Sequence, residues 1–317
     1  MARIALLDDY QEVALHMADW RSLPPDTDLQ VFRDHLFDED ALVQRLIDFD
    51  IIMAMRERTP FTRSLLERLP NLKLLITSGM RNASIDVQAA QDCGTLVCGT
   101  GGLPYPTAEL TWGLILAIMR RIPREDQAIR TGHWQVTTGL GLQGKTLGIM
   151  GLGRLGSQVA AVGNAFKMNI IAWSQNLTAE RAQAGGATLV SKDDLLSRCD
   201  ILTIHLVLSD RTRGLIGAHE LRQMQPTAYL INTSRGPIVD EPALIQALEQ
   251  GIIAGAALDV FDVEPLPLEH PLRRLDNTVL TPHLGYVTDE TYRVFYGEAL
   301  ENIQAFLKGE PIRVLKA

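Results

Sequence analysis

The sequence predicts an α/β protein made of two doubly wound, parallel-sheet domains. Short apolar runs alternate with amphipathic helical patterns along nearly the whole chain. Continuous apolar strands that are separated by helices are typical of parallel sheets covered on both faces. The chain has 317 residues, which corresponds to two domains at about 150 residues each. With 46% hydrophobic and 21% charged residues, it can bury a core without disulfides or metals.

The first part of the chain contains five apolar runs that predict strands. Amphipathic segments at 40–47 and 85–92 predict helices between them. A longer helical pattern follows at about 107–130, interrupted only by Gly113 and Pro123, and we expect one long helix that crosses to the second domain. The five predicted strands are 4–7, 29–32, 51–54, 72–77 and 95–98.

The second part begins after a turn-rich stretch at 139–144 and repeats the alternation. A helix is expected at 154–166, and a closing helix at about 289–308 could return to the first domain. The six predicted strands are 146–150, 170–173, 201–204, 228–232, 255–258 and 278–280.

Charge and cysteine content narrow the classes of partner. Acidic residues exceed basic ones by 38 − 30 = 8, which disfavours a nucleic-acid-binding protein. Cys93, Cys98 and Cys199 predict buried thiols in a reducing compartment rather than a disulfide framework or a metal site. The N-terminus lacks a signal-peptide pattern, and the longest apolar stretch, 110–119, is too short to span a bilayer. We therefore expect a cytoplasmic protein with no metal, nucleic-acid or membrane partner.

A glycine-rich loop between a predicted strand and a predicted helix indicates a dinucleotide site. Gly151 permits a tight turn, Gly153 lets the backbone approach a pyrophosphate, and Gly156 lets the helix pack closely on the strand. The helix N-terminus adds free N–H groups and a partial positive charge. A glycine-rich turn without a ligand is the alternative. The loop residues are Gly151, Leu152, Gly153, Arg154, Leu155 and Gly156.

The end of the next strand bears on the choice of cofactor. Ser174 stands where a ribose-binding carboxylate is expected, and neutral Gln175 and Asn176 follow it. Without that carboxylate, nothing at this position repels a 2′-phosphate, so the cofactor is NAD or NADP with a modest preference for NADP. Arg181 could reach such a phosphate or could be a solvated helix residue.

Three later segments each place a polar residue just after a predicted strand, where open α/β sheets bind their ligands. Arg235 follows the strand at 228–232. The alternative interpretation is a surface residue paired with Asp240. Asp259 and Glu264 follow the strand at 255–258. The alternative interpretation is that they are solvated turn residues. His283 follows the strand at 278–280, and a lone histidine is more often structural.

Taken together, these residues form a chemical set. A histidine with its ordinary pKa of about 6.5 exchanges protons near neutral pH, and an adjacent carboxylate favours the imidazolium. An arginine can fix a carboxylate or polarise a carbonyl. Beside a nicotinamide, such a set can move a hydride and a proton between a carbonyl and an alcohol.

Four stretches together resemble the D-isomer-specific 2-hydroxyacid dehydrogenase family. They are Gly-Leu-Gly-Arg-Leu-Gly at 151–156, Asn-Thr-Ser-Arg-Gly at 232–236, Leu-Asp-Val-Phe-Asp-Val-Glu-Pro at 258–265 and Thr-Pro-His-Leu-Gly at 281–285. Their order and spacing fit the family across nearly the whole chain. The resemblance implies a flavodoxin-like substrate domain at 1–100 plus 286–317 and a Rossmann cofactor domain at 101–285. It also implies a homodimer built largely through the cofactor domain.

The resemblance also implies roles for individual residues. Arg235 would bind the carboxylate and carbonyl of a small 2-oxo acid, with His283 as general acid/base and Glu264 as its partner. Asp259 would accept a hydrogen bond from the nicotinamide carboxamide. Backbone N–H groups of Ser78, Gly79 and Met80 would hold the substrate carboxylate, and further cofactor contacts are expected at Thr107, His205, Thr233 and Gly285.

The expected activity is an NAD(P)-dependent reduction of glyoxylate, hydroxypyruvate or a similar 2-oxo acid to a D-2-hydroxy acid. A dinucleotide-binding sensor or corepressor with little turnover is the alternative. The substrate side chain stays open. Arg56 and Arg81 could hold a second anionic group or could be surface residues, and an apolar pocket could instead be lined by Met53, Met55, Met80, Tyr286 and Tyr292.

Overall fold

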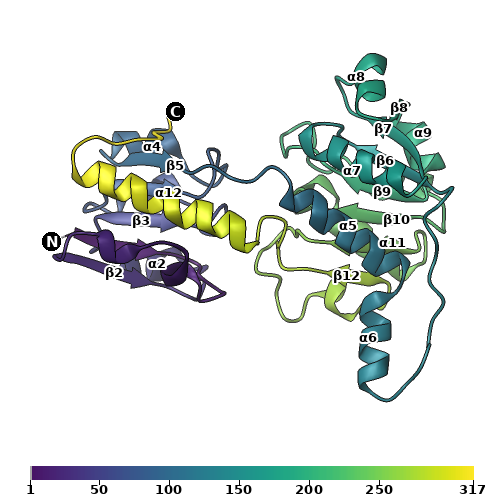
Figure 1. Ribbon diagram of the computed structural model, residues 1–317, viewed down its shortest axis with the longest axis horizontal. Helices are drawn as coiled ribbons and strands as arrows, with labels where there is room; N and C mark the ends of the chain where they lie inside the picture. Colours follow the sequence, from purple (N-terminus) through teal and green to yellow (C-terminus); the bar gives the residue numbers. More distant parts are fainter. Residues whose placement is uncertain (1) are drawn as a thin grey trace. The chain divides into compact units, whose positions relative to one another are not determined.

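The computed structural model describes residues 2–317, and the chain divides into two units (Figure 1). Unit 1 comprises the residues up to 103 together with 288–317, and unit 2 comprises 104–287. Each unit is built on one parallel sheet, so the predicted fold class is confirmed. The assignment of a substrate role to one unit and a cofactor role to the other stays a prediction.

Unit 1 has a five-stranded sheet in the order β2-β1-β3-β4-β5. This order is that of flavodoxin-like folds. Apolar residues fill β3 and β4 on both faces, which is why these strands were visible as continuous hydrophobic runs. The strands are β1 (Ala2–Leu6), β2 (Thr27–Val31), β3 (Ile51–Ala54), β4 (Leu74–Thr77) and β5 (Leu96–Gly99).

The helices of unit 1 begin at polar caps. Asp38, Thr62, Asp86 and Thr288 each accept a hydrogen bond from a backbone N–H in the first turn of the following helix. The closing helix α12 (Asp289–Leu307) packs on α1 and β4 of this unit. The other helices are α1 (Ala14–Met17), α2 (Glu39–Leu46), α3 (Arg63–Glu67) and α4 (Val87–Asp92), with a 3-10 turn, η1 (Trp20–Ser22).

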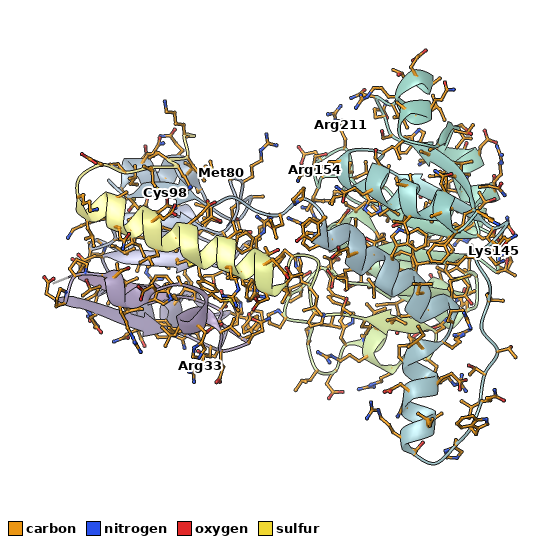
Figure 2. The ribbon with its side chains drawn as sticks, in the orientation of Figure 1. Arg33, Met80, Cys98, Lys145, Arg154 and Arg211 are labelled. Atoms are coloured by element: carbon orange, nitrogen blue, oxygen red, sulfur yellow. The ribbon has the colours of Figure 1, made fainter. Side chains whose placement is uncertain are left out.

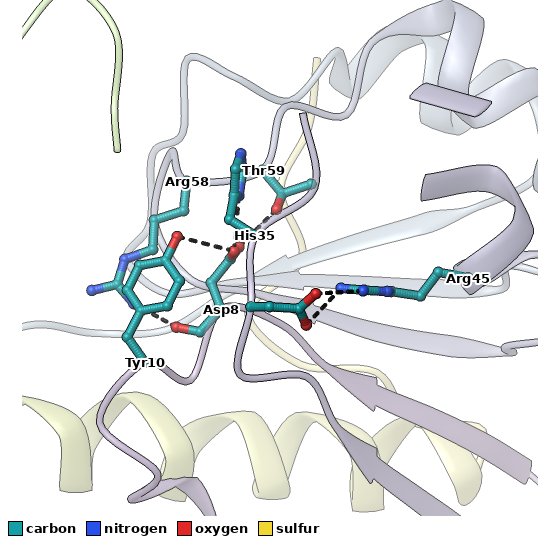
Figure 3. Close-up of polar contacts among 7 residues, drawn as sticks. Asp8, Tyr10, His35, Arg45, Arg58 and Thr59 are labelled. Carbon is teal, nitrogen blue, oxygen red and sulfur yellow. Dashed lines mark hydrogen bonds and ion pairs between the residues drawn. The ribbon is translucent and has the colours of Figure 1, made fainter. Parts of the chain in front are cut away.

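A buried polar cluster ties three strand ends of unit 1 together (Figure 3). Asp8, 1% exposed, follows β1, and its carboxylate accepts from the Thr59 hydroxyl at 2.7 Å and the Tyr10 hydroxyl at 3.3 Å. His35 Nδ1 lies 3.0 Å from the same carboxylate. Because His35 follows β2 and Thr59 follows β3, one side chain fixes three loops at the carboxyl edge of the sheet.

Unit 2 has a seven-stranded parallel sheet in the order β12-β11-β10-β9-β6-β7-β8. The strand order reverses at β6, which pairs with β7 on one side and β9 on the other, as in Rossmann folds. The strands are β6 (Thr146–Met150), β7 (Asn169–Trp173), β8 (Thr188–Leu189), β9 (Ile201–Ile204), β10 (Tyr229–Asn232), β11 (Gly255–Leu258) and β12 (Thr278–Leu280). The two residues of β8 are too few to give a hydrophobic run, so the sequence did not predict this strand.

Hydrophobic clusters cover both faces of this sheet. Neighbouring residues of β10 point to opposite sides, so that Leu230 joins one cluster and Ile231 the other. Helices α5 and α7 lie over the face of Ile231, and α9 to α11 lie over the face of Leu230. The helices are α5 (Pro106–Met119), α6 (Ile122–Arg130), α7 (Arg154–Ala165), α8 (Ala179–Ala184), α9 (Lys192–Arg198), α10 (Ala218–Gln223) and α11 (Glu241–Glu249), with 3-10 turns η2 (Gly236–Ile238) and η3 (Pro271–Arg274).

The single long helix expected at 107–130 is wrong, because the structure breaks it into α5 and α6. Arg121, between them, adopts a left-handed conformation with φ of 56°. Pro123 explains the break, since proline has no N–H to donate and its ring clashes with the carbonyl four residues earlier, here that of Met119. Proline is tolerated in the first turn of α6, where its missing N–H costs nothing.

Within residues 2–317, no helix is long and apolar enough to cross a bilayer. In the same residues, no group of three or more His, Cys, Asp or Glu side chains is placed to hold a metal ion. The cytoplasmic location stays a prediction.

Candidate functional site

The glycine loop of unit 2 has the geometry of a phosphate cradle. Gly151 has φ of +102°, and a Cβ there would lie 2.5 Å from the His205 carbonyl oxygen. A Cβ at Gly156 would lie 2.1 Å from the Gly151 carbonyl oxygen, so α7 approaches β6 as closely as only glycine allows. A Cβ at Gly153 would meet no atom within 4 Å. The N-terminus of α7 therefore opens onto free space beside backbone N–H donors, and this donor set fits a pyrophosphate.

His205 follows β9 and borders this loop. Its Nε2 lies 3.0 Å from the Thr203 hydroxyl, while its Nδ1 is buried and has no hydrogen-bond partner among the described residues. Burial lowers the pKa of His205 to about 4, so the ring is neutral at pH 7. An unpartnered buried nitrogen beside the loop is a further observation that fits a polar ligand at this place.

The depressed pKa of His205 predicts a pH-dependent loss of stability. Below an unfolded-state pKa of about 6.5, the unfolded chain binds a proton that the folded chain takes up only near pH 4. The free energy of unfolding therefore falls between these pH values, by at most about 3 kcal/mol. Measured by urea denaturation, the free energy of unfolding of the His205→Asn variant should fall less over this pH range than that of wild type. The exposed His219→Asn variant is the control and should lose as much stability as wild type. If the free energy of unfolding of His205→Asn depended on pH as steeply as that of wild type, the prediction would be contradicted.

The residues expected at the adenosine ribose follow β7. Ser174 is half-buried and its carbonyl accepts from the Leu177 N–H at 3.1 Å, which closes a turn over Gln175 and Asn176. Both of these side chains are exposed. Arg181 is an exposed residue of α8 whose backbone N–H bonds the cap Thr178. The turn thus carries neutral polar groups and no carboxylate.

Asp259 organises the loop after β12. It is fully buried, and its carboxylate accepts from the Thr281 hydroxyl at 2.6 Å, the Leu284 N–H at 2.7 Å and the Gly285 N–H at 2.9 Å. Burial raises the pKa of Asp259, and these hydrogen bonds oppose that rise. Among the described residues, Oδ2 accepts only the Gly285 N–H, so one of its acceptor positions remains for a ligand.

Three threonines join the same network. The Thr107 hydroxyl donates to the Gly285 carbonyl at 2.9 Å, and the hydroxyls of Thr111 and Thr233 lie 2.9 Å apart. Thr111 in turn donates to the Thr107 carbonyl. The structure therefore brings together the expected cofactor residues Thr107, Thr233, Asp259 and Gly285. The sequence analysis missed Thr281, although it lies in the quoted Thr-Pro-His-Leu-Gly stretch.

His283 and Glu264 form a close pair. The Nδ1 atom of His283 lies 2.5 Å from Glu264 Oε2, and Glu264 Oε1 accepts from the Phe261 N–H at 2.9 Å. His283 has a left-handed backbone with φ of 55°, and its N–H donates to the Asp259 carbonyl at 2.8 Å. Because Nδ1 is engaged by Glu264, Nε2 is the nitrogen that remains for proton exchange.

Arg235 is held by the turn after β10. Asn232 closes this turn by donating to the Arg235 carbonyl at 3.0 Å and accepting from the Ser234 N–H at 3.0 Å. The guanidinium Nη1 donates to the Ser234 carbonyl at 2.7 Å, which orients the side chain. The sequence analysis did not identify the role of Asn232, although Asn and Asp commonly close such turns.

Strand register places these groups at one edge of the sheet. Asn232 pairs with Leu258, and Leu258 pairs with Leu280. The segments that carry Arg235, Glu264 and His283 therefore leave three adjacent strands at the same end, as the sequence predicted from their order.

The substrate loop expected in unit 1 differs in detail from the expectation. The Ser78 N–H donates to the Ala54 carbonyl at 3.2 Å, and the Gly79 N–H donates to the Thr100 hydroxyl at 2.9 Å. These two donors are thus already used within unit 1, whereas the N–H of the exposed Met80, labelled in Figure 2, has no hydrogen-bond acceptor among the described residues. The role of Ser78, Gly79 and Met80 in holding a carboxylate stays a prediction.

Arg56 lies against this loop. Its Nη1 donates to the Ser78 carbonyl at 2.9 Å, and its N–H donates to the Ser78 hydroxyl at 2.8 Å. A Cβ at Gly79 would lie 2.0 Å from Nη1, so glycine is required for the guanidinium to occupy this position. Asn82 donates to the Arg56 carbonyl at 2.6 Å and fixes the turn. Of the two arginines that the sequence left open, Arg56 bonds to Ser78 of the expected substrate loop, and Arg81 follows Met80 directly in the chain.

The fold and this set of residues define an oxidoreductase with a dinucleotide-binding domain. The sequence pattern described as "D-isomer specific 2-hydroxyacid dehydrogenase, NAD binding domain" matches residues 112–285. The chain belongs to the D-isomer-specific 2-hydroxyacid dehydrogenase family, as its motifs predicted, and it is accordingly a 2-hydroxyacid dehydrogenase that uses a nicotinamide cofactor.

Named relatives cover most of the chain. A glyoxylate reductase of Aeropyrum pernix is 45% identical over 256 residues, which are 78% of this chain and 76% of that protein. A glyoxylate reductase of Thermofilum pendens is 38% identical over 97% of this chain and 88% of its own length. The crystal structure of a phosphoglycerate oxidoreductase from Vibrio cholerae is 37% identical, with a TM-score of 0.92 over 98% of this chain and 100% of that one.

Proposed function

We propose that this protein reduces a small 2-oxo acid, with glyoxylate and hydroxypyruvate as the first candidates, to the D-2-hydroxy acid. The observation that carries the proposal is the contact between His283 Nδ1 and Glu264 Oε2 at the sheet edge that also bears Arg235. The names of the Aeropyrum pernix and Thermofilum pendens relatives support the choice of substrate.

The glycine loop and the Asp259 network are the places for the cofactor. Backbone N–H groups at the start of α7 would bind the pyrophosphate, and Ser174 would face the adenosine ribose. The remaining acceptor position of Asp259 and the neighbouring threonines would bind the nicotinamide end. When bound, the nicotinamide supplies the hydride.

His283 would donate the proton to the substrate carbonyl oxygen from Nε2. Glu264 holds the ring through Nδ1 and stabilises the positive charge of the imidazolium. Arg235 would bind the carboxylate and polarise the carbonyl through its planar set of donors. Unit 1, taken by itself, offers the Met80 N–H and Arg56 as donors that would bind a carboxylate.

A sensor that binds the dinucleotide without turnover is the second candidate, because it could keep the same loop and network. Consumption of reduced cofactor separates the two functions. The enzyme should oxidise NADH or NADPH when glyoxylate, hydroxypyruvate or another member of a panel of about a dozen 2-oxo acids is added. A protein that binds the cofactor but turns over none of the panel would instead be a sensor.

The neutral turn after β7 predicts relaxed cofactor specificity with a modest preference for NADPH. Ser174 can bond one ribose hydroxyl but carries no charge to repel a 2′-phosphate. The Ser174→Asp variant should shift the ratio of kcat/KM towards NADH, and Gln183→Glu on the exposed side of α8 should leave it near wild type. A wild-type preference for NADH beyond about 100-fold, or about 2.7 kcal/mol, would contradict this prediction.

The homodimer is part of the proposal and is supported by exposed apolar side chains of unit 2. Helix α6 projects from the sheet in Figure 1, and it and the loop after it expose Ile129 to 55% and Trp134 to 73%. Large exposed apolar groups of this kind mark interaction sites. The Ile129→Asp/Trp134→Asp variant should sediment as a monomer and wild type as a dimer. Leu15→Asp, on α1 of unit 1, should stay dimeric, and a monomeric wild type would contradict the proposal.

A further inference from the structure

Glu241 binds both ends of the loop that carries Glu264. It is the first residue of α11, and its side chain is 15% exposed. Its Oε2 accepts from the Asp262 N–H at 3.3 Å, and its Oε1 lies 3.1 Å from His270 Nε2. One carboxylate thus joins the start and the end of the segment 262–270. Glu264 lies within this segment.

His270 is oriented towards this carboxylate. Its Nδ1 is buried and has no hydrogen-bond partner among residues 2–317, while its Nε2 faces Glu241, a carboxylate that can only accept from it. Asp240, Asp262 and Arg213 are the other charged groups nearby. Burial and repulsion from Glu241 raise the pKa of Asp262, while Arg213 opposes the rise.

The peptide between Phe261 and Asp262 connects Glu241 to the residues of the proposed reaction. The Asp262 N–H of this peptide donates to Glu241 Oε2, and the N–H of the preceding peptide, at Phe261, donates to Glu264 Oε1. Gly236 also lies close to this peptide. A Cβ built on Gly236 would lie 2.2 Å from the Phe261 carbonyl atoms and 2.7 Å from the Asp262 nitrogen. Gly236 thus packs against this peptide while Glu241 accepts its N–H, so a shift of the peptide would displace the loop that carries Glu264.

We propose that Glu241 is a positioning residue that holds the Phe261–Asp262 peptide and the 262–270 loop in place, and thereby sets the contact between Glu264 and His283. The proposal rests on the proposed function, in which that contact supports proton transfer. Glu241 does not itself touch the reacting groups, so its effect passes through Glu264.

The expected effect is a loss of kcat without a loss of cofactor binding. A misplacement of about 1 Å can cost about 100-fold in rate, so Glu241→Ala should lower kcat about 10- to 100-fold. Glu241→Gln should also lower kcat, because its amide has one oxygen and cannot accept at both ends of the loop. Cofactor affinity, measured by fluorescence titration, should stay near wild type in both variants.

The test is a double-mutant cycle with Glu264→Gln, which should itself lower kcat about tenfold or more. If Glu241 acts through Glu264, Glu241→Ala should lower kcat much less in the Glu264→Gln background than in wild type. Glu220→Ala is the matched control. Glu220 is 16% exposed, accepts from the Gly217 N–H at 3.1 Å and pairs with Lys192 at 2.9 Å, but lies on α10. This variant should lose stability and keep kcat.

Equal fold-losses of kcat in both backgrounds, or wild-type kcat in Glu241→Ala, would overturn the positioning role. Wild-type kcat in Glu264→Gln would instead overturn the proposed function, so the two failures are distinguishable. Should Glu241→Ala fail to fold, His270 provides the second test. His270→Leu removes the donor to Glu241 and should lower kcat, while His270→Gln keeps an N–H donor and should restore it. Equal kcat in these two variants would also overturn the proposal.

Discussion

Replacing His283 with Asn is expected to lower kcat about 10²- to 10⁴-fold while cofactor affinity stays near wild type. General acid–base groups contribute a factor of this size, and Nε2 is the ring nitrogen that Glu264 leaves available. Asn is the appropriate replacement because His283 has φ of 55°, a conformation that Asn adopts more readily than Ala. The measurements are steady-state kcat and cofactor titration on the same preparation.

The exposed His219→Asn variant is the control for this experiment and should match wild type. The residual rate of His283→Asn should not depend on Glu264, because Glu264 would act through the missing ring. Wild-type turnover in His283→Asn would remove this residue from the mechanism. A parallel loss of cofactor affinity would instead indicate a disturbed loop, since His283 donates its N–H to the Asp259 carbonyl.

Arg235→Lys should lower kcat/KM about 10²- to 10³-fold although the charge is kept, the size expected when a donor to the reacting carbonyl is lost. An ammonium cannot reproduce the planar, two-pronged contact with a carboxylate and its neighbouring carbonyl. The guanidinium is already oriented by its bond to the Ser234 carbonyl, and lysine would lose this geometry as well. Arg222→Lys, exposed on α10, is the matched control and should keep the wild-type value.

Chemical rescue refines this prediction. Guanidinium ions added to Arg235→Ala should restore part of the rate, whereas methylammonium ions of equal charge should restore much less. Near-wild-type efficiency of Arg235→Lys, or equal rescue by both cations, would show that Arg235 supplies only a diffuse positive field.

Much of the fold was predictable because parallel strands are hydrophobic on both faces. The runs at 51–54, 146–150, 201–204 and 255–258 became strands with the same bounds. The expectation of one long helix did not take into account that Pro123 cannot stand in a helix interior, which is where the chain breaks between α5 and α6. The two-residue β8 has no periodic pattern and is defined only by its pairing with β7.

The candidate site was predictable where chemistry coincides with a strand end. Arg235, Glu264 and His283 follow adjacent strands, so sequence order implied their proximity. The internal bonds of Ser78 and Gly79 could not be predicted, because their acceptors, Ala54 at the end of β3 and Thr100 after β5, are distant in the sequence. Glu241 could not be predicted as a contact of the 262–270 loop, since both of its bonds to that loop are long-range.

The reaction of hydroxypyruvate with reduced cofactor tests the central claim most directly. Wild-type protein should consume NADH or NADPH in equal amount to the substrate, and chiral analysis should find D-glycerate as the product, while His283→Asn binds the cofactor without consuming it. Formation of the L isomer, or bound reduced cofactor that persists with every 2-oxo acid of the panel, would contradict the account.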